Sequence, residues 1–274
     1  MGNKSAIDLV REKRLIFTVT TGRSGTAYLA SIFGYARNAH SFHEPSPEYV
    51  NVLRDAQTES NLARRFIIEE KIPAIARESA HIYIETSHLV CKGFLESWLD
   101  IGIVPDLIIH RRSLRDVSLS LFKMGTIPGR SDKGLKFYLS PADPNVIKLA
   151  DWEHCHDYQL CFWYCLEIEK RARGYKLLFN QHGARIAETT LAELKTFTGL
   201  EKCFSDLALQ VKVPAWLTRI RFLRSSGVKV NQSIETKKDV IIPDNLFELE
   251  QEVIDKIDDP DVQEWASKMS HGIA

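Results

Sequence analysis

The chain lacks a long hydrophobic run, a surplus of charge of either sign, and paired cysteines. No stretch approaches the roughly 18 consecutive apolar residues that a membrane-spanning helix needs, and the start MGNKSAIDLVREKR lacks the apolar core of a signal peptide. The 36 basic and 36 acidic side chains cancel, which argues against a general nucleic-acid-binding role. The five cysteines form no C-x-x-C pair. These absences predict a cytosolic, cytoplasmic protein with reduced thiols and with neither a membrane nor a nucleic acid as partner.

The length and the order of the patterns predict an α/β fold. Apolar, strand-like runs alternate with helical patterns, which is typical of a central, mainly parallel sheet flanked by helices. Strands are expected near residues 15–20, 38–43, 81–85, 104–110 and 175–179, and helices near 26–36, 58–79, 90–100, 114–124, 152–173, 187–198 and 244–256. No linker divides the 274 residues, so a single domain over 1–274 is expected. Residues 125–150, rich in Pro, Gly and Asp, are expected to form a lid or substrate loop.

The stretch TVTTGRSGTAYLASIF, residues 18–33, has the pattern of a buried strand, a tight turn and a helix. A helix start presents backbone N–H groups without partners and the positive end of the helix dipole. Gly22 and Gly25 allow an anion to approach the backbone closely. The stretch therefore predicts a P-loop-like phosphate-binding turn, with an ordinary turn packed through small residues as the alternative.

This turn differs from two common nucleotide-binding motifs. A triphosphatase loop carries a Lys before the Ser or Thr that holds magnesium, whereas Gly25 is followed directly by Thr26. The spacing of the glycines also excludes the dinucleotide pattern G-x-G-x-x-G. The cation of the turn is Arg23, whose planar donors suit one phosphate or sulfate group. A metal-assisted triphosphate site is therefore not expected.

A second basic stretch, VPDLIIHRRSLRDVSLSLFKMG, places Arg111, Arg112 and Arg115 in the first turns of a predicted helix. Cations there oppose the helix dipole, so a second bound anion would explain them. Arg112 and Ser120, two helical turns apart, can face the same ligand. A basic helix start exposed to water is the alternative.

Together, TGRSGTAYL and the pattern R-x-x-x-D-x-x-x-S at Arg112, Asp116 and Ser120 resemble the two signature segments of sulfotransferases that use 3′-phosphoadenosine 5′-phosphosulfate (PAPS). The resemblance extends loosely to LAELKTFTGL, residues 191–200. It implies that the first loop holds the 5′-phosphosulfate, that the Arg and Ser hold the 3′-phosphate, and that 3′-phosphoadenosine 5′-phosphate (PAP) is a product. The nucleotide-binding residues that it implies are Gly22, Arg23, Ser24, Gly25, Thr26, Ala27, Tyr28, Arg112 and Ser120.

The chain departs from the cytosolic members of that family at three places. Ala27 and Tyr28 stand where many of them have Thr and Trp. Arg23 replaces the Lys of that branch and agrees instead with the carbohydrate and tyrosyl-protein branches. RFLRSSGVKVNQS, residues 221–233, stands where cytosolic members carry an R-K-G element, so the resemblance at Arg224 is limited.

Two residues are candidates for the base that takes a proton from the acceptor. Glu44, in FHEPSPEY, follows the second predicted strand, at the edge where ligands collect in open parallel sheets, and its place resembles that of the catalytic Glu in the carbohydrate and tyrosyl-protein branches. His88, in YIETSHLV, follows the next strand, and its place resembles that of the catalytic His of cytosolic members. A Glu before Pro can instead brace a turn, and a His after a strand can be a structural hydrogen-bonder. His43 and Glu85 are expected to orient the base, and Arg23 to stabilise charge on the leaving phosphate.

No metal is expected. DWEHCHDYQLCFWYCLEIEK, residues 151–170, holds two histidines and three cysteines, but its apolar groups follow helical spacing, and residues along one helix cannot surround a tetrahedral ion. The sequence thus predicts a sulfotransferase that moves a sulfuryl group from PAPS to a hydroxyl or amine of a small-molecule acceptor by in-line displacement. The alternatives are a kinase-like, nucleotide-dependent phosphotransferase, which the missing Lys disfavours, and a non-catalytic nucleotide-binding sensor or scaffold. Neither the acceptor nor the oligomeric state follows from the sequence.

Overall fold

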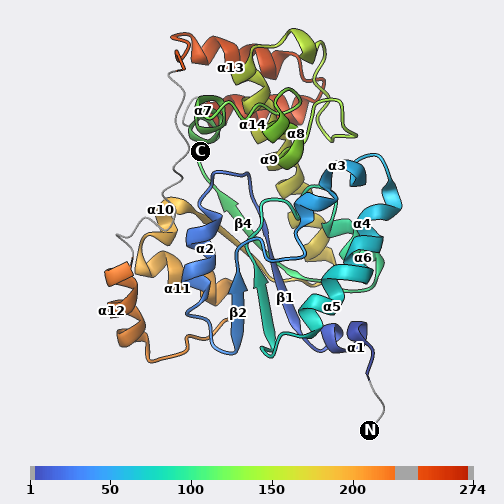
Figure 1. Ribbon diagram of the computed structural model, residues 1–274. Coiled ribbons are helices and arrows are strands. Elements are labelled where there is room, and N and C mark those ends of the chain that lie inside the picture. The colour runs from blue at the N-terminus through green and yellow to red at the C-terminus, as the bar shows by residue number, and fades with distance from the viewer. Residues whose placement is uncertain (1–3, 226–239, 271–274) are drawn as a thin grey trace. The chain divides into compact units, whose positions relative to one another are not determined.

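The structure of the chain is a computed structural model that describes residues 4–225 and 240–270 (Figure 1). The chain divides into two compact units, the first of Met1–Arg111 and Gly174–Gln232 and the second of Arg112–Arg173 and Ser233–Ala274. The expectation of a single domain stays a prediction. Over residues 4–225 and 240–270, no helix combines the length and the apolar character that a membrane crossing requires.

The first unit contains a five-stranded sheet in which every pair of neighbours is parallel, with the strand order β2-β3-β1-β4-β5. The strands are β1 (Arg14–Val19), β2 (Ala39–Phe42), β3 (Ile82–Glu85), β4 (Asp106–Arg111) and β5 (Ile186–Thr190). The central strands β1 and β4 are almost wholly buried, which suits their apolar segments, residues 15–17 and 107–109, in a sheet covered on both faces. The predicted α/β fold with a parallel sheet is confirmed. Because the strands are parallel, the turns that follow β1, β2 and β3 lie at one edge of the sheet.

Nine helices of the first unit are described: α1 (Ala6–Arg11), α2 (Thr26–Phe33), α3 (Leu53–Ala56), α4 (Ser60–Phe66), α5 (Ile72–Ala76), α6 (Leu95–Asp100), α10 (Leu191–Leu194), α11 (Phe197–Asp206) and α12 (Ala215–Ser225). A 3₁₀ turn, Tyr49–Asn51, precedes α3, and a π-helical turn, Ile67–Lys71, joins α4 to α5. The described part of the second unit contains α7 (Leu114–Lys123), α8 (Asp132–Phe137), a 3₁₀ turn at Trp152–His154, most of α9 (Asp157–Gln181), α13 (Leu246–Asp255) and α14 (Pro260–Ser270). The division between the units falls within α9.

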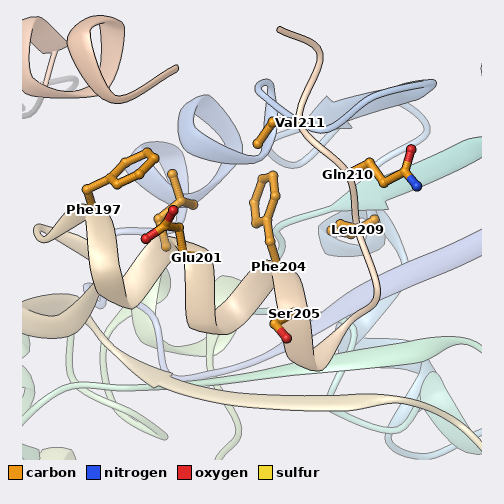
Figure 2. Close-up of a pocket in the computed structure, with 8 residues that line it drawn as sticks. Phe197, Glu201, Phe204, Ser205, Leu209, Gln210 and Val211 are labelled. Atoms are coloured by element: carbon orange, nitrogen blue, oxygen red, sulfur yellow. The ribbon is translucent and has the colours of Figure 1, made fainter. Parts of the chain in front are cut away.

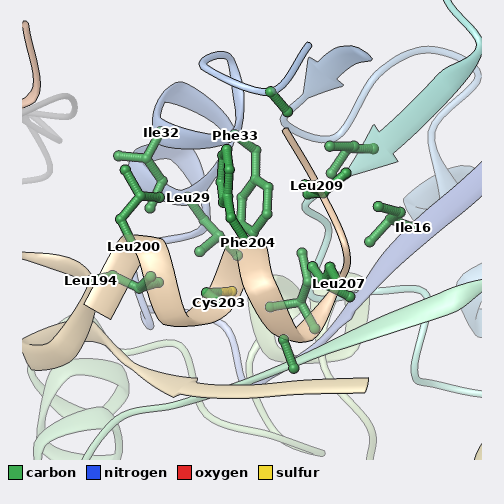
Figure 3. Packing of buried hydrophobic residues seen from close by; sticks show 14 of the residues in the cluster. Ile16, Leu29, Ile32, Phe33, Leu194, Leu200, Cys203, Phe204, Leu207 and Leu209 are labelled. Atoms are coloured by element: carbon green, nitrogen blue, oxygen red, sulfur yellow. The ribbon is translucent and has the colours of Figure 1, made fainter. Parts of the chain in front are cut away.

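Helices cover both faces of the sheet, and successive residues of β1 show how. Ile16 belongs to the buried cluster that α2 and α11 form on one face (Figure 3). The rings of Phe33 and Phe204 stack at the centre of this cluster, with their centroids 5.4 Å apart. The next residue of the strand, Phe17, packs instead against Trp98 of α6, at 5.3 Å between centroids. Alternate side chains of a strand point to opposite faces, so β1 supplies both cores.

The first four predicted strands and most predicted helices are confirmed, but the fifth strand is wrong. Residues 175–179 lie in α9, where Tyr175 and Phe179, one helical turn apart, are buried while Leu177 between them is 67% exposed. This spacing is helical, although the segment YKLLF is as apolar as a short strand. The true fifth strand is β5, so the helix predicted over 187–198 is also wrong at its start. A capping box between Thr190 and Glu193 begins α10 directly after the strand.

Residues 125–150 are not an open loop within the second unit. They include α8, and several of their side chains are buried, among them Tyr138 and Leu139. The carboxylate of Glu167 on α9 accepts the backbone N–H groups of Val146 and Ile147 at 3.1 and 2.7 Å. The predicted role as a lid or substrate loop stays a prediction.

Candidate active site

The turn between β1 and α2 has backbone geometry that suits close approach of an anion. Arg23 and Gly25 both adopt left-handed conformations, with φ of 64° and 95°. Gly25 is the N-cap of α2 and forms no side-chain cap, so no N-cap side chain occupies the start of the helix. A Cβ at Gly25 would lie 3.2 Å from Leu191 Cδ1. The left-handed conformation therefore favours glycine at this position, and a larger residue would also need the Leu191 side chain to move slightly.

Buried hydrogen bonds hold this turn from behind. The hydroxyl of Ser24 is fully buried, donates to the carbonyl of Thr21 at 2.8 Å, and lies 2.8 Å from the Thr20 hydroxyl. Thr20 Oγ1 donates to the carbonyl of His110 at 2.6 Å, and His110 Nε2 donates to the carbonyl of Ser24 at 3.0 Å. Burial lowers the pKa of His110, so this imidazole stays neutral. Since the Ser24 side chain braces the turn, its contact with a ligand would come from its backbone N–H.

The rest of the predicted phosphate loop packs against its neighbours. The carbonyl of Thr26 accepts the hydroxyl of Thr86 at 2.9 Å, which joins the start of α2 to the end of β3. The Tyr28 hydroxyl donates to the carbonyl of Leu194 on α10 at 2.9 Å, and burial raises the pKa of this phenol. Ala27, between Thr26 and Tyr28 in the sequence, is half-buried. A role of Tyr28 in stacking on adenine stays a prediction.

The two candidate bases lie next to one another at the same edge of the sheet. Glu44, after β2, has left-handed backbone with φ of 47°. Its Oε1 atom lies 3.5 Å from Nε2 of His88, which follows β3. That oxygen is buried and has no hydrogen-bond partner among the residues described. The sequence did not predict that these two alternatives form one pair.

A lysine that the sequence analysis missed determines what His88 can do. Lys92 is fully buried, and its Nζ lies 2.9 Å from Nδ1 of His88. A lysine ammonium only donates, so Nδ1 is the acceptor and the neutral ring carries its hydrogen on Nε2, which faces Glu44. Burial, assisted by the charges of Lys92, His43 and Arg23, lowers the pKa of His88 well below its ordinary value. In the neutral form, Nδ1 accepts from Lys92 and Nε2 carries a hydrogen, so the ring is poorly suited to take a proton. The choice of Glu44 as the base stays a prediction.

Replacing Lys92 with methionine tests this tautomer. Methionine keeps the length of the side chain but removes the donor and the charge, so the pKa of His88 should rise and the Nδ1–H tautomer should become populated. ¹⁵N chemical shifts of the imidazole, assigned with a His88→Gln variant, would measure both changes. A spectrum of Lys92→Met identical to that of the unmodified chain would mean that Lys92 does not select the tautomer.

The two residues expected to orient the base have partners of their own. His43 Nδ1 donates to the carbonyl of Thr86 at 3.0 Å. Glu85 is fully buried, and its carboxylate accepts from Lys71 at 2.9 and 2.8 Å and from the Tyr83 hydroxyl at 2.9 Å. Burial is the largest cause of a raised pKa at Glu85. That these two residues orient the base stays a prediction.

The basic stretch after β4 is mostly used within the protein. Arg111 pairs with Glu188 at 2.7 Å in the first unit. In the second unit, Arg115 makes a bidentate pair with the buried Glu250, at 2.8 and 2.6 Å, and this pair raises the pKa of Arg115. These two arginines need no bound anion to explain them, contrary to the sequence-based interpretation. Arg112 Nε lies 3.8 Å from Oδ2 of Asp116.

Arg112 and Ser120 both belong to the second unit, Ser120 as a half-buried residue of α7. The β1–α2 turn belongs to the first unit, so a nucleotide bound by both segments stays a prediction. The side chain of Arg224 and residues 226–233 lie outside the part of the chain that the structure describes.

No cluster of metal-binding character occurs in the described ranges, where no three His, Cys, Asp or Glu side chains could hold a metal ion. All five cysteines are buried and outside any disulfide, and Cys161 and Cys165 are buried residues of α9. A groove of about 460 Å³ lies between α11 and the segment that follows it (Figure 2). Its lining of Phe197, Leu200, Glu201, Phe204, Ser205, Leu209, Gln210 and Val211 includes none of the predicted site residues.

The chain is similar to the crystal structure of mouse sulfotransferase SULT7A1 complexed with PAP, with a TM-score of 0.49 and 14% sequence identity, over 93% of this chain and 88% of that chain. No protein-family model matches the chain, and no curated protein matches its sequence. At this identity the similarity concerns the fold alone and assigns no role to any residue.

Proposed function

We propose that the chain is a PAPS-dependent sulfotransferase in which Glu44 is the general base. The observation that carries this proposal is the Oε1 atom of Glu44, buried without a hydrogen-bond partner among the described residues and 3.5 Å from His88 Nε2. A carboxylate oxygen with unused lone pairs, at the edge of a parallel sheet where ligands bind, is suited to accept a proton. The sequence motifs of the β1–α2 turn and of Arg112 support the choice of nucleotide.

Each group of the site has a defined part in the reaction. PAPS supplies a sulfuryl group that is already activated by its phosphate leaving group. The backbone N–H groups of the β1–α2 turn and the guanidinium of Arg23 bind the phosphosulfate and stabilise the charge that develops on the leaving phosphate. Glu44 takes the acceptor proton at Oε1 as the acceptor oxygen or nitrogen bonds to sulfur and the bridging S–O bond breaks. His88 stays neutral, and its Nε2, 3.5 Å from Oε1 of Glu44, limits where the carboxylate can lie, so that the ring orients the base.

The remaining parts of the proposal concern specificity. Arg112 and Ser120 would bind the 3′-phosphate, which distinguishes PAPS and PAP from ordinary adenine nucleotides. The acceptor would be a small molecule with a hydroxyl or an amine, since the chemistry needs only a nucleophile that loses a proton. A sulfuryl group transferred in this way needs no metal ligand from the chain.

Thermal unfolding with nucleotides tests the proposed function. PAP at 100 times its dissociation constant should add about 2.7 kcal/mol to the free energy of unfolding. ATP with magnesium, the matched control, should add much less at the same concentration, because the turn lacks the triphosphatase Lys. Stabilisation by ATP with magnesium alone would instead indicate a phosphotransferase. Binding of PAP without transfer of labelled sulfate from PAPS to any member of an acceptor library would indicate a nucleotide sensor.

A further inference from the structure

A buried ion pair lies directly behind the turn that carries Glu44. Lys71 and Glu85 are each 1% exposed at their side chains, and the lysine Nζ lies 2.9 and 2.8 Å from the two carboxylate oxygens. The Tyr83 hydroxyl donates to the same carboxylate, and the ammonium stands 4.4 Å from the centroid of the Tyr49 ring. A fully desolvated pair of this kind is weak support for stability, because apolar replacements of similar volume are often as stable. Its presence beside the proposed base therefore needs a further explanation.

The ammonium of Lys71 also reaches the backbone of the Glu44 turn. Its Nζ lies 3.4 Å from the carbonyl of Pro45, the residue after Glu44. On the other side of Glu44, the ring of His43 donates to the carbonyl of Thr86 at 3.0 Å. Glu44 itself has a left-handed backbone, which a residue with a long side chain adopts only where its surroundings hold it. The two flanking hydrogen bonds are contacts that hold it.

The local backbone of Lys71 is unusual as well. Lys71 is the last residue of the π-helical turn Ile67–Lys71 between α4 and α5. Such turns are rare and occur frequently at functional sites, where the extra residue changes the direction of a side chain. Here Lys71, whose side chain contacts Pro45, is the residue at which the chain returns from the π-helical turn to the α-helical geometry of α5.

We propose that Lys71 is a positioning residue for Glu44, and that its pair with Glu85 fixes the ammonium at the point from which it holds the Pro45 carbonyl. The proposal rests on the proposed function in its choice of Glu44 as the base. Burial is the main cause of the raised pKa of Glu85, and the charge of Glu44 adds a smaller contribution in the same direction, as expected for two carboxylates near one another. Without Lys71, the turn would lose one of its two anchors, and the Glu44 carboxylate would leave its place beside His88.

Three variants test this role. Lys71→Met removes the donor and keeps the length of the side chain. The triple variant K71M/E85M/Y83F replaces every polar group of the network, so that no buried charge or hydroxyl is left without a partner if the single variant fails to fold. The matched control, Arg14→Met, breaks a pair with Asp106 at 2.6 Å that lies at the opposite end of strands β1 and β4.

Two measurements separate positioning from a merely structural role. Hydrogen exchange of the backbone amides in residues 43–48 should become about tenfold faster in both Lys71 variants, as expected for the loss of a hydrogen bond from a charged donor. With PAPS and an accepted substrate, kcat should fall by about 10²-fold, the effect of displacing a catalytic group by roughly 1 Å, while the affinity for PAP stays unchanged. The Arg14 control should change neither quantity.

The outcomes also distinguish the two proposals. A triple variant that folds, with exchange at residues 43–48 and kcat both unchanged, would show that the pair serves packing alone. Faster exchange at residues 43–48, confined to the Lys71 variants, would support the anchoring role even if the unmodified chain transferred no sulfuryl group. In that case the proposed sulfuryl transfer would be wrong, while the proposed role of Lys71 in holding the turn at residues 43–48 would hold.

Discussion

Glu44→Gln should lower kcat by about 10²–10⁴-fold, the usual contribution of a positioned general base. Glutamine has the same shape as glutamate but cannot take a proton, so the acceptor would have to lose its proton to water. The affinity for PAP should change little, because Glu44 lies after β2 whereas the proposed phosphate contacts come from the β1–α2 turn. Steady-state kinetics with PAPS and an accepted substrate, together with calorimetric titration of PAP, would measure the two quantities.

The control for this experiment lies in the same turn. Glu48 is exposed and precedes the 3₁₀ turn at Tyr49–Asn51, so Glu48→Gln removes an equal charge without touching His88 and should leave kcat unchanged. His88→Gln should reduce kcat less than Glu44→Gln does, since the imidazole orients the base and does not take the proton. The reverse order of the two losses would assign the base to His88 and contradict the tautomer inferred from Lys92.

The second large effect is expected at Arg112. Arg112→Ala should weaken PAP binding by about 1.5–3 kcal/mol, or roughly 10- to 150-fold, because a charge-assisted hydrogen bond to the 3′-phosphate is lost. Adenosine 5′-phosphate, which has a 3′-hydroxyl, should bind the variant and the unmodified chain alike. The ratio of the two affinities, measured by calorimetric titration, reports the 3′-phosphate contact alone.

A control arginine separates this contact from net charge. Arg64 is exposed on α4, and Arg64→Ala removes one positive charge from the first unit without touching α7. It should leave both affinities and their ratio unchanged. Equal losses of PAP and adenosine 5′-phosphate in Arg112→Ala would remove Arg112 from the 3′-phosphate site and leave Ser120 without its proposed partner.

The sequence predicted the central strands β1 and β4 well because they are buried on both faces. Their apolar segments, residues 15–17 and 107–109, are typical of strands in a parallel sheet that is covered on both faces. The failure at residues 175–179 has the opposite cause. Those residues end the 25-residue helix α9, and a short apolar segment seen alone does not distinguish a strand from a buried helical face. Residues 175–179 are helical because they continue the long helix that begins at Asp157.

The candidate site was predicted in part, and the missing part is what determines the chemistry. Glu44 and His88 could be chosen from their places after strands, since the ends of parallel strands meet at one edge. Lys92 and Lys71 could not, because lysines in a sequence are expected at the surface. Their burial depends on acceptors supplied from other segments, the His88 ring and the Glu85 carboxylate. Only the three-dimensional contacts show which nitrogen of His88 is occupied.

The backbone conformation at Glu44 favours a different residue from the one that the contact with His88 needs. Glycine, asparagine or aspartate would adopt its left-handed conformation with less strain, so the turn alone gives no reason for a glutamate. The longer side chain of glutamate brings the carboxylate to the His88 imidazole, at the cost of backbone strain at residue 44. Replacing Glu44 with one of these residues should therefore raise the stability of the fold and lower the activity. Laboratory evolution for thermal stability and laboratory evolution for turnover would favour different residues at this position.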